Sequence, residues 1–152
     1  MKQIIALSYF ILLSSCQSDV STYIPFIEGY WEIVSVTKDQ KKVKEFKMSG
    51  SVDYFKVNAD LSGYRKKVTP RFDGAFEMSQ HASKFTLSIK DDHLWIHYDN
   101  NDVAYREEIL RANAASLVIS NSDGFIYTYK PYEPLIFEEW VNAKTIRSKS
   151  MI

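Results

Sequence analysis

A two-residue alternation of apolar and polar side chains runs through most of the chain after Pro25, and it constrains the fold more than any other feature. In the stretch HLWIHY, Leu94, Ile96 and Tyr98 fall on one face of an extended segment. Successive side chains of a strand point to opposite sides, so this period predicts strands with one buried face. Asn, Asp, Ser and Gly, which suit tight turns, separate the runs. Strands are therefore predicted near residues 29–37, 52–58, 63–69, 73–79, 83–90, 93–99, 103–111, 116–120 and 124–130.

Eight or nine short strands in one small domain leave a problem at the edges of their sheet. The chain has 152 residues, enough for one domain with one core. A long open sheet exposes unpaired backbone groups at its edges, and closure removes those edges. We therefore predict an all-β fold, an up-and-down antiparallel β-barrel over residues 27–131 with room for side chains or one small ligand. A two-sheet sandwich predicts the same alternation and remains the alternative.

Two segments depart from the alternation. Residues 38–50 are rich in lysine and are predicted to form a solvated loop between the first two strands. Residues 132–152 are predicted to form a short helix on the barrel wall and a tail, because four apolar residues recur there at helical spacing: Ile136, Phe137, Trp140 and Val141. A last strand followed by a frayed tail is the alternative.

The first fifteen residues differ in composition from the rest. An apolar run at 4–13 follows Lys2, and its length of about ten residues suits a secretory signal but is too short to span a bilayer. The run ends at Cys16, the only cysteine in the chain. One cysteine gives no intramolecular disulfide, and a secreted protein with disulfides would be expected to carry more. Residues 1–15 are thus predicted to be a signal peptide, and 16–26 a polar tether; a secreted protein with a chance cysteine at the cleavage site is the alternative.

The stretch Leu13-Ser14-Ser15-Cys16 resembles the lipobox of bacterial lipoproteins. The resemblance implies cleavage before Cys16, a diacylglyceryl group on its sulfur and a further acyl chain, such as palmitate, on the new N-terminus. Several acyl chains anchor a protein firmly where one binds only marginally. The implied location is the cell envelope, with the protein anchored in a membrane through Cys16. Gln17 stands where an Asp would favour the inner membrane, so the outer membrane is expected.

The first predicted strand carries Gly29-Tyr30-Trp31, which resembles the G-x-W signature of lipocalins and related calycins. The stretch YREEILRANAASLVISN, at 105–121, is similar to the penultimate hairpin of lipocalin-like lipoproteins common in Bacteroidetes. The resemblance implies a lipocalin-like barrel in which Gly29 lets the chain bend and Trp31 plugs one end. It also implies that Lys130 replaces the arginine that usually covers this tryptophan. The second lipocalin signature, T-D-Y, is not recognisable.

Aromatic residues make up 14% of the chain and supply the candidates for a binding site. Rings give contact area and hydroxyls give direction, so a tyrosine-rich interior would suit a small hydrophobic ligand with a polar end. The candidates for lining such a cavity are Tyr54, Phe55, Phe85, Trp95, Tyr105, Phe125, Tyr127 and Tyr129. The alternative is that these rings fill the barrel, and that the protein is a structural or interaction lipoprotein without a ligand.

Other function classes receive no support from the sequence. Basic and acidic residues balance at 19 each, which gives no reason to expect a nucleic-acid partner. His93 and His97 would lie about 13 Å apart on a strand, too far to share a metal ion. No catalytic motif is recognisable, so no enzyme activity, metal or other cofactor is predicted.

Overall fold

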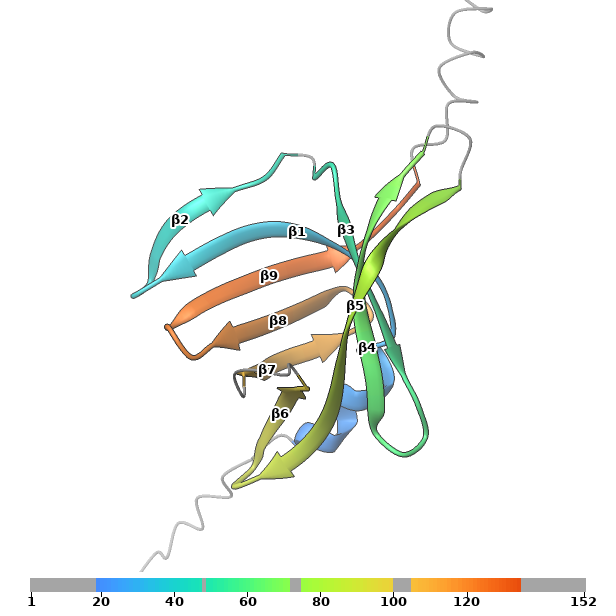
Figure 1. Cartoon of the computed structure of the whole chain (residues 1–152). Helices are drawn as coiled ribbons and strands as arrows, with labels where there is room; N and C mark the ends of the chain where they lie inside the picture. Colours follow the sequence, from blue (N-terminus) through green and yellow to red (C-terminus); the bar gives the residue numbers. More distant parts are fainter. Residues whose placement is uncertain (1–18, 48, 72–74, 100–104, 135–152) are drawn as a thin grey trace, which may run out of the picture.

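The described part of the chain forms one short helix and nine antiparallel strands (Figure 1). The computed structural model describes residues 19–47, 49–71, 75–99 and 105–134. The 3-10 helix η1 spans Val20–Phe26, and the strands are β1 Gly29–Lys38, β2 Lys41–Glu45, β3 Val52–Val57, β4 Ser62–Pro70, β5 Phe76–Lys90, β6 His93–Tyr98, β7 Tyr105–Asn113, β8 Ser116–Asn121 and β9 Phe125–Pro131. The predicted signal peptide, Cys16 and the predicted C-terminal helix lie outside the described residues.

The sheet closes because β1 pairs with the last strand as well as with the second and third. The strand order is β2-β1-β3-β4-β5-β6-β7-β8-β9, with β1 also paired to β9. That second pairing runs from Trp31 opposite Pro131 to Lys38 opposite Phe125. Eight strands therefore form a closed barrel and β2 is an additional strand, as the fold prediction of eight to nine strands required. In Figure 1 strands β1, β9, β8, β7 and β6 follow one another along one wall, and β3, β4 and β5 form the facing wall.

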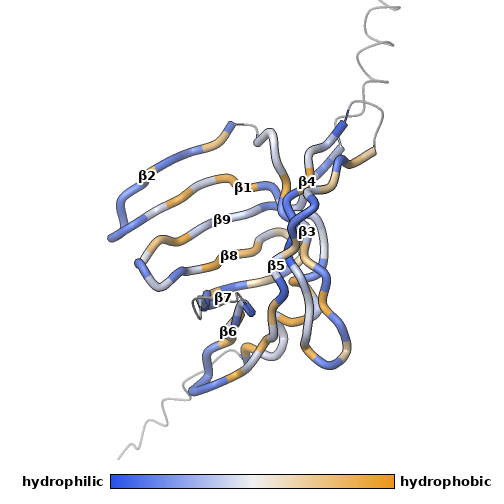
Figure 2. Tube along the Cα trace, viewed as in Figure 1, coloured by the Kyte–Doolittle hydropathy of each residue, from blue (hydrophilic) through white to orange (hydrophobic). Residues whose placement is uncertain are grey.

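Two strand assignments differ from the sequence prediction. Lys41–Glu45, expected within a loop, pairs with β1 as the strand β2. The two residues before it, Asp39 and Gln40, both have positive φ, as a tight hairpin turn requires. All five residues of β2 are exposed, so this part of the chain is solvated as predicted, and it is mostly hydrophilic in Figure 2. The strand predicted at 83–90 and the described part of the strand predicted at 73–79 belong to one long strand, β5, with a register shift where β4 faces it.

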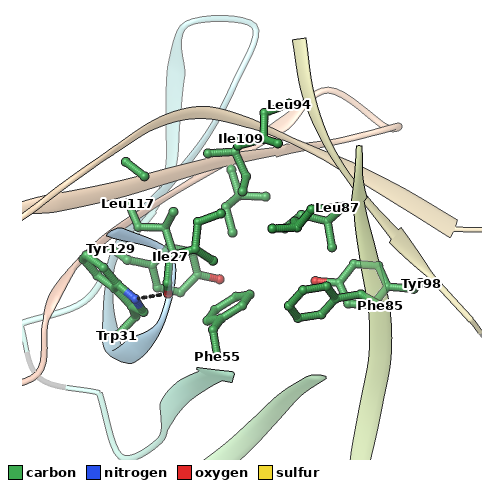
Figure 3. Close-up of a cluster of buried hydrophobic side chains, with 13 residues drawn as sticks. Ile27, Trp31, Phe55, Phe85, Leu87, Leu94, Tyr98, Ile109, Leu117 and Tyr129 are labelled. Atoms are coloured by element: carbon green, nitrogen blue, oxygen red, sulfur yellow. Dashed lines mark hydrogen bonds between the residues drawn. The ribbon is translucent and has the colours of Figure 1, made fainter. Parts of the chain in front are cut away.

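One half of the barrel is solid. The inward apolar side chains form a single buried cluster, shown in Figure 3, whose aliphatic members and alanine are Ile27, Leu87, Leu94, Ile96, Ile109, Ala112, Leu117 and Ile119. Helix η1 packs against β6 and β7 and so closes this end. Ile27, the residue after the helix, has no exposed surface. The rings of Phe55 and Phe85 fill the space between the walls, with their centroids 6.2 Å apart.

Trp31 is buried at the closed end, as the G-x-W resemblance implied. Its side chain is 4% exposed, and its Nε1 donates a hydrogen bond of 2.9 Å to the carbonyl oxygen of Ile27 (Figure 3). Gly29 has a φ of 144°, which a residue with a side chain rarely adopts. This bend lets the chain turn from Ile27 into β1. Trp31 is thus buried in the structure, and Gly29 has a backbone conformation that suits a bend.

The prediction that Lys130 covers Trp31 was wrong. In the β1–β9 register Lys130 lies opposite Glu32, and Trp31 lies opposite Pro131. Lys130 and Glu32 therefore share the outer face of the barrel, whereas Trp31 points inward. Lys130 Nζ lies 3.2 Å from Glu32 Oε2, with more than half of the lysine side chain exposed.

The predicted flexible tether also differs from the structure where it is described. Asp19 caps η1 by accepting a hydrogen bond of 2.9 Å from the backbone N–H of Ser21. Val20, Tyr23 and Ile24 of the helix pack against the core. The segment 20–26 is therefore an ordered part of the barrel end. Within the described ranges no helix is long and apolar enough to cross a membrane.

Candidate functional site: a polar cavity in the open half of the barrel

A cavity of about 490 Å³ opens in the half of the barrel away from η1. On each contributing strand the cavity residues lie toward one barrel end and the core residues toward the other. On β7, for example, Tyr105 and Glu107 line the cavity while Ile109 and Ala112 join the core. No aliphatic side chain is found among the described residues that line it. The lining consists of Asp53 from β3, Arg65 and Lys67 from β4, Ser79, His81 and Ser83 from β5, Tyr98 from β6, and Tyr105 and Glu107 from β7.

Arg65 forms the floor of this cavity. Its Nη2 donates hydrogen bonds of 2.7 Å to Asp53 Oδ2 and 2.8 Å to the Tyr129 hydroxyl. Its Nη1 lies 3.2 Å from Glu107 Oε2 and 3.3 Å from the Tyr98 hydroxyl. On the core side the guanidinium carbon lies 5.1 Å from the centroid of the Phe55 ring. Arg65 therefore separates the solid half of the barrel from the hollow half.

Two buried carboxylates flank the arginine. The side chains of Asp53 and Glu107 are 5% and 6% exposed. Lys67 Nζ, on a side chain that is 66% exposed, lies 3.0 Å from Asp53 Oδ1. The Tyr98 and Tyr105 hydroxyls donate to Glu107, at 2.7 Å and 3.1 Å. Both carboxylates are thus fixed by several donors, as buried charges must be.

These contacts set the ionisation of the floor. Burial by itself would raise the pKa of Asp53, but the Arg65 guanidinium and the Lys67 ammonium lower it below its ordinary value. Burial would lower the pKa of Arg65, but the phenol oxygens and the carboxylate around it raise that pKa above the ordinary value. Asp53 and Arg65 are therefore both charged at neutral pH.

The two tyrosines of the cavity keep their protons. Burial, together with the negative charge of Glu107, raises the pKa of Tyr105 to about 12. Burial also raises the pKa of Tyr98, and the nearby Arg65 only partly opposes this rise. Both hydroxyls therefore remain available as donors to Glu107 over the physiological pH range.

The aromatic residues predicted to line a cavity are distributed over several regions of the barrel. Tyr105 is the member of the set that lines the cavity. Tyr129 lies beneath it, with its hydroxyl bonded to Arg65. Phe55 and Phe85 belong to the core.

The remaining predicted lining residues lie elsewhere. Tyr54 is on the outer face, where its ring centroid lies 4.6 Å from that of Tyr30. Trp95 is outside as well, because Leu94 and Ile96 point inward; the Arg106 guanidinium carbon lies 4.5 Å from its ring centroid. Two further members belong to β9, and one of them, Tyr127, packs against the core cluster. Tyr127 accepts a hydrogen bond from Asn121, and the Phe125 ring lies under Lys38 Nζ.

Sequence reasoning missed the charged residues that define the cavity. Asp53 lies two residues before Phe55, and Glu107 two residues before Ile109, so each shares a strand face with a core residue. Arg65 likewise shares a face with Gly63, whose missing side chain makes room for Phe85. A charged side chain on the apolar face of a strand was the signal that could have identified Asp53 and Glu107, whereas the face of Arg65 carries Gly63 and Lys67 and gave no such signal.

The histidines do not meet in the structure. His81 lines the cavity, whereas His93 pairs with Glu108 and His97 with Ser88 on the outer surface. In the part of the chain that the structure describes, no three potential metal ligands are close enough to hold an ion.

A closed eight-stranded antiparallel barrel with a tryptophan plug at one end and a cavity at the other defines the class of lipocalin-type β-barrels. Comparison with known families agrees with this class. Residues 27–119 match the Lipocalin-like domain, and the chain belongs to that family. Members of the family are typically binding proteins. No curated protein matches the chain.

Proposed function

We propose that this protein binds a small molecule in the cavity above Arg65 and is held at a membrane of the cell envelope by acyl chains on Cys16. The cavity carries the first part of the proposal. Its volume of about 490 Å³ is within the range of small-molecule sites. Its floor is a set of buried charges whose positions are fixed before any ligand arrives, which reduces the entropy lost on binding.

The lining also bears on the kind of ligand. A small hydrophobic molecule with a polar end suits the tyrosine rings of the wall and the charges of the floor. A wholly apolar molecule would cover Asp53 and Glu107 without offering them a hydrogen bond, which is unfavourable. The polar end is therefore the part that meets the floor.

A filled barrel that acts only through protein contacts is less well supported. The solid half, from Trp31 to Phe85, fits that alternative. The hollow half does not, because close packing would be expected to fill it with side chains. Binding in the open half is accordingly the function that the geometry favours.

The proposed anchor has a consequence for orientation. Cys16 is three residues from Asp19, which caps η1 at the closed end of the barrel. Three residues span at most about 10 Å. The acyl chains would therefore enter the membrane near the closed end, and the cavity would open away from the bilayer.

Native mass spectrometry of the protein purified from its own host tests the binding function. We expect an additional mass that is lost on denaturation. Ser83→Trp, which places an indole in the cavity, should abolish that mass. Ala82→Trp is the matched control, because Ala82 is the next residue on β5, is exposed and faces outward. A bare mass for the wild type in repeated preparations would contradict the proposal.

The anchor is tested separately by Cys16→Ser followed by membrane fractionation. The wild-type protein should sediment with membranes, and the variant should be released. Retention of the variant in the membrane fraction would refute the lipid anchor but would leave the binding function untouched.

A further inference from the structure

The geometry points to a small organic cation as the ligand class, an amine or guanidine whose charged nitrogen meets Asp53 and Glu107. This inference rests on the proposed binding function and makes it specific. It follows from the charges, the unused hydrogen-bonding capacity and the rings of the cavity.

The buried charges of the floor do not balance. Asp53 and Glu107 supply two negative charges, and Arg65 supplies one positive charge in direct contact with both. The balancing charge comes from Lys67, whose side chain extends from the rim and is 66% exposed. Without that ammonium the buried part of the site carries a net negative charge, which favours a cation.

The donors of the floor are already committed. Each terminal nitrogen of Arg65 contacts one carboxylate and one tyrosine hydroxyl. The Tyr98 and Tyr105 hydroxyls donate to Glu107. A carboxylate can accept about four hydrogen bonds, so both acids retain acceptor capacity. A ligand that reaches the floor must therefore supply N–H or O–H donors to these carboxylates.

Lys67 shows where a ligand nitrogen would sit. Its Nζ is 3.0 Å from Asp53 Oδ1, a normal length for an ammonium–carboxylate contact. Its long and exposed stem can turn toward solvent with little loss, since exposed ion pairs contribute little to stability. A ligand ammonium would replace the lysine and bring its apolar part into the space that the stem leaves.

The tyrosine rings favour the same charge. Tyr98 and Tyr105 both line the cavity, and their ring centroids are 5.6 Å apart at an angle of 31°. Aromatic faces attract cations, most strongly where water is excluded. Both hydroxyls point to Glu107, so the rings extend from the carboxylate along the wall.

An anionic ligand is the competing possibility. Replacing Lys67 distinguishes a cationic ligand from an anionic one. The rim offers Lys67 and His81 to an anion, but the floor would repel it through Asp53 and Glu107. Replacing Lys67 should strengthen the binding of a cation, since a competing ammonium is removed. The same replacement should weaken the binding of an anion.

The test uses three probes of nearly equal size: 2-phenylethylamine, 3-phenylpropionate and 2-phenylethanol. Dissociation constants are measured by NMR titration at pH 7 in an amine-free buffer of low ionic strength. The charged amine should bind at least about tenfold more tightly than the acid or the alcohol. Lys67→Met should strengthen amine binding roughly two- to fivefold, the size expected for one exposed ion pair. Lys66→Met, on the outer face of the same strand, is the matched control and should change nothing.

Glu107→Gln tests the floor directly. It keeps an acceptor for the tyrosine hydroxyls but removes the charge, so amine affinity should fall at least about tenfold. If this variant does not fold, the change in amine affinity caused by Lys67→Met decides by itself whether the ligand class is cationic. Three results would overturn the cation inference. They are binding of 3-phenylpropionate that is tighter than that of 2-phenylethylamine, amine binding that is weaker in Lys67→Met than in the wild type, and no binding of any probe at millimolar concentration. An additional mass in native mass spectrometry would still support the binding function in each of these cases, and a bare mass would reject both.

Discussion

Arg65→Met is expected to destabilise the fold strongly at neutral pH. The substitution keeps most of the apolar stem and removes the guanidinium. It leaves the carboxylates of Asp53 and Glu107, 5% and 6% exposed, without their shared partner. Removing one partner of a buried ion pair typically costs about 3–5 kcal/mol. At about 4 kcal/mol, the ratio of folded to unfolded protein would fall by roughly a thousandfold.

The pH dependence of this loss follows from the direction of the pKa shift. In the wild type, Arg65 and Lys67 overcome the effect of burial and hold the pKa of Asp53 below its ordinary value. The stabilisation from this carboxylate is therefore present above the ordinary pKa and is lost as the pH falls through the lowered one. In the variant the guanidinium no longer opposes the effect of burial on the pKa of Asp53, so protonation of this carboxylate at low pH relieves part of the destabilisation. The difference between the two proteins should be largest at pH 7 and should shrink toward pH 4.

Urea unfolding at pH 7, 5.5 and 4.5 measures the difference. Lys67→Met is the control, because its ammonium binds the same Asp53 from a largely exposed side chain and should contribute less than about 1 kcal/mol. If Arg65→Met does not fold at pH 7, adding Asp53→Asn and Glu107→Gln removes the buried charges and should restore folding. A loss below about 1 kcal/mol for Arg65→Met, or a loss that is equal at all three pH values, would refute the reasoning.

Two further predictions concern other parts of the barrel. Gly63→Ala should lower the free energy of unfolding, measured by thermal unfolding, by about 3 kcal/mol or more, because the new Cβ would lie 2.1 Å from the carbonyl oxygen of Lys56. Gly50→Ala is the control: no atom lies within 4 Å of the new Cβ, so the free energy of unfolding should change by less than about 1 kcal/mol. The hydrogen bond to Glu108 raises the pKa of His93, so an NMR titration should find this pKa above the ordinary histidine value, and Glu108→Gln should lower it. The stabilisation from this pair is present below the ordinary histidine pKa and is lost as the pH rises through the raised one. An equal loss from both glycine variants, or a histidine pKa unchanged by Glu108→Gln, would contradict these expectations.

The strands and their inward faces were predictable because they depend on local sequence. The alternation that places Leu94, Ile96 and Tyr98 on one face is present in the barrel without change. The two aspartates of the β5–β6 turn, Asp91 and Asp92, both have positive φ, as predicted for a tight hairpin. The G-x-W signature correctly indicated a buried tryptophan at a barrel end. These features require no knowledge of which strands become neighbours across the barrel.

The features that were missed depend on pairing between distant segments. Lys130 lies outside because the β1–β9 register places it opposite Glu32. The lysine-rich segment forms β2 because its residues pair with the C-terminal half of β1, from Ser35 to Lys38. The cavity floor joins Arg65 to Tyr129, 64 residues later in the chain. No periodicity within one strand carries that information, since register is set by the assembled sheet.

The composition of the floor is not explained by stability. Well-packed apolar residues in place of a buried ion pair are often as stable as the pair or more stable. The solid half of this barrel shows that the chain can fill its interior with apolar residues such as Ile27 and Leu117. Asp53, Arg65 and Glu107 instead hold buried charge beside an open space, balanced only through the exposed side chain of Lys67, at a cost in desolvation that a filled core would avoid. Sites that bind or react commonly trade stability for such arrangements. The polar floor is therefore the feature on which the proposed binding function rests.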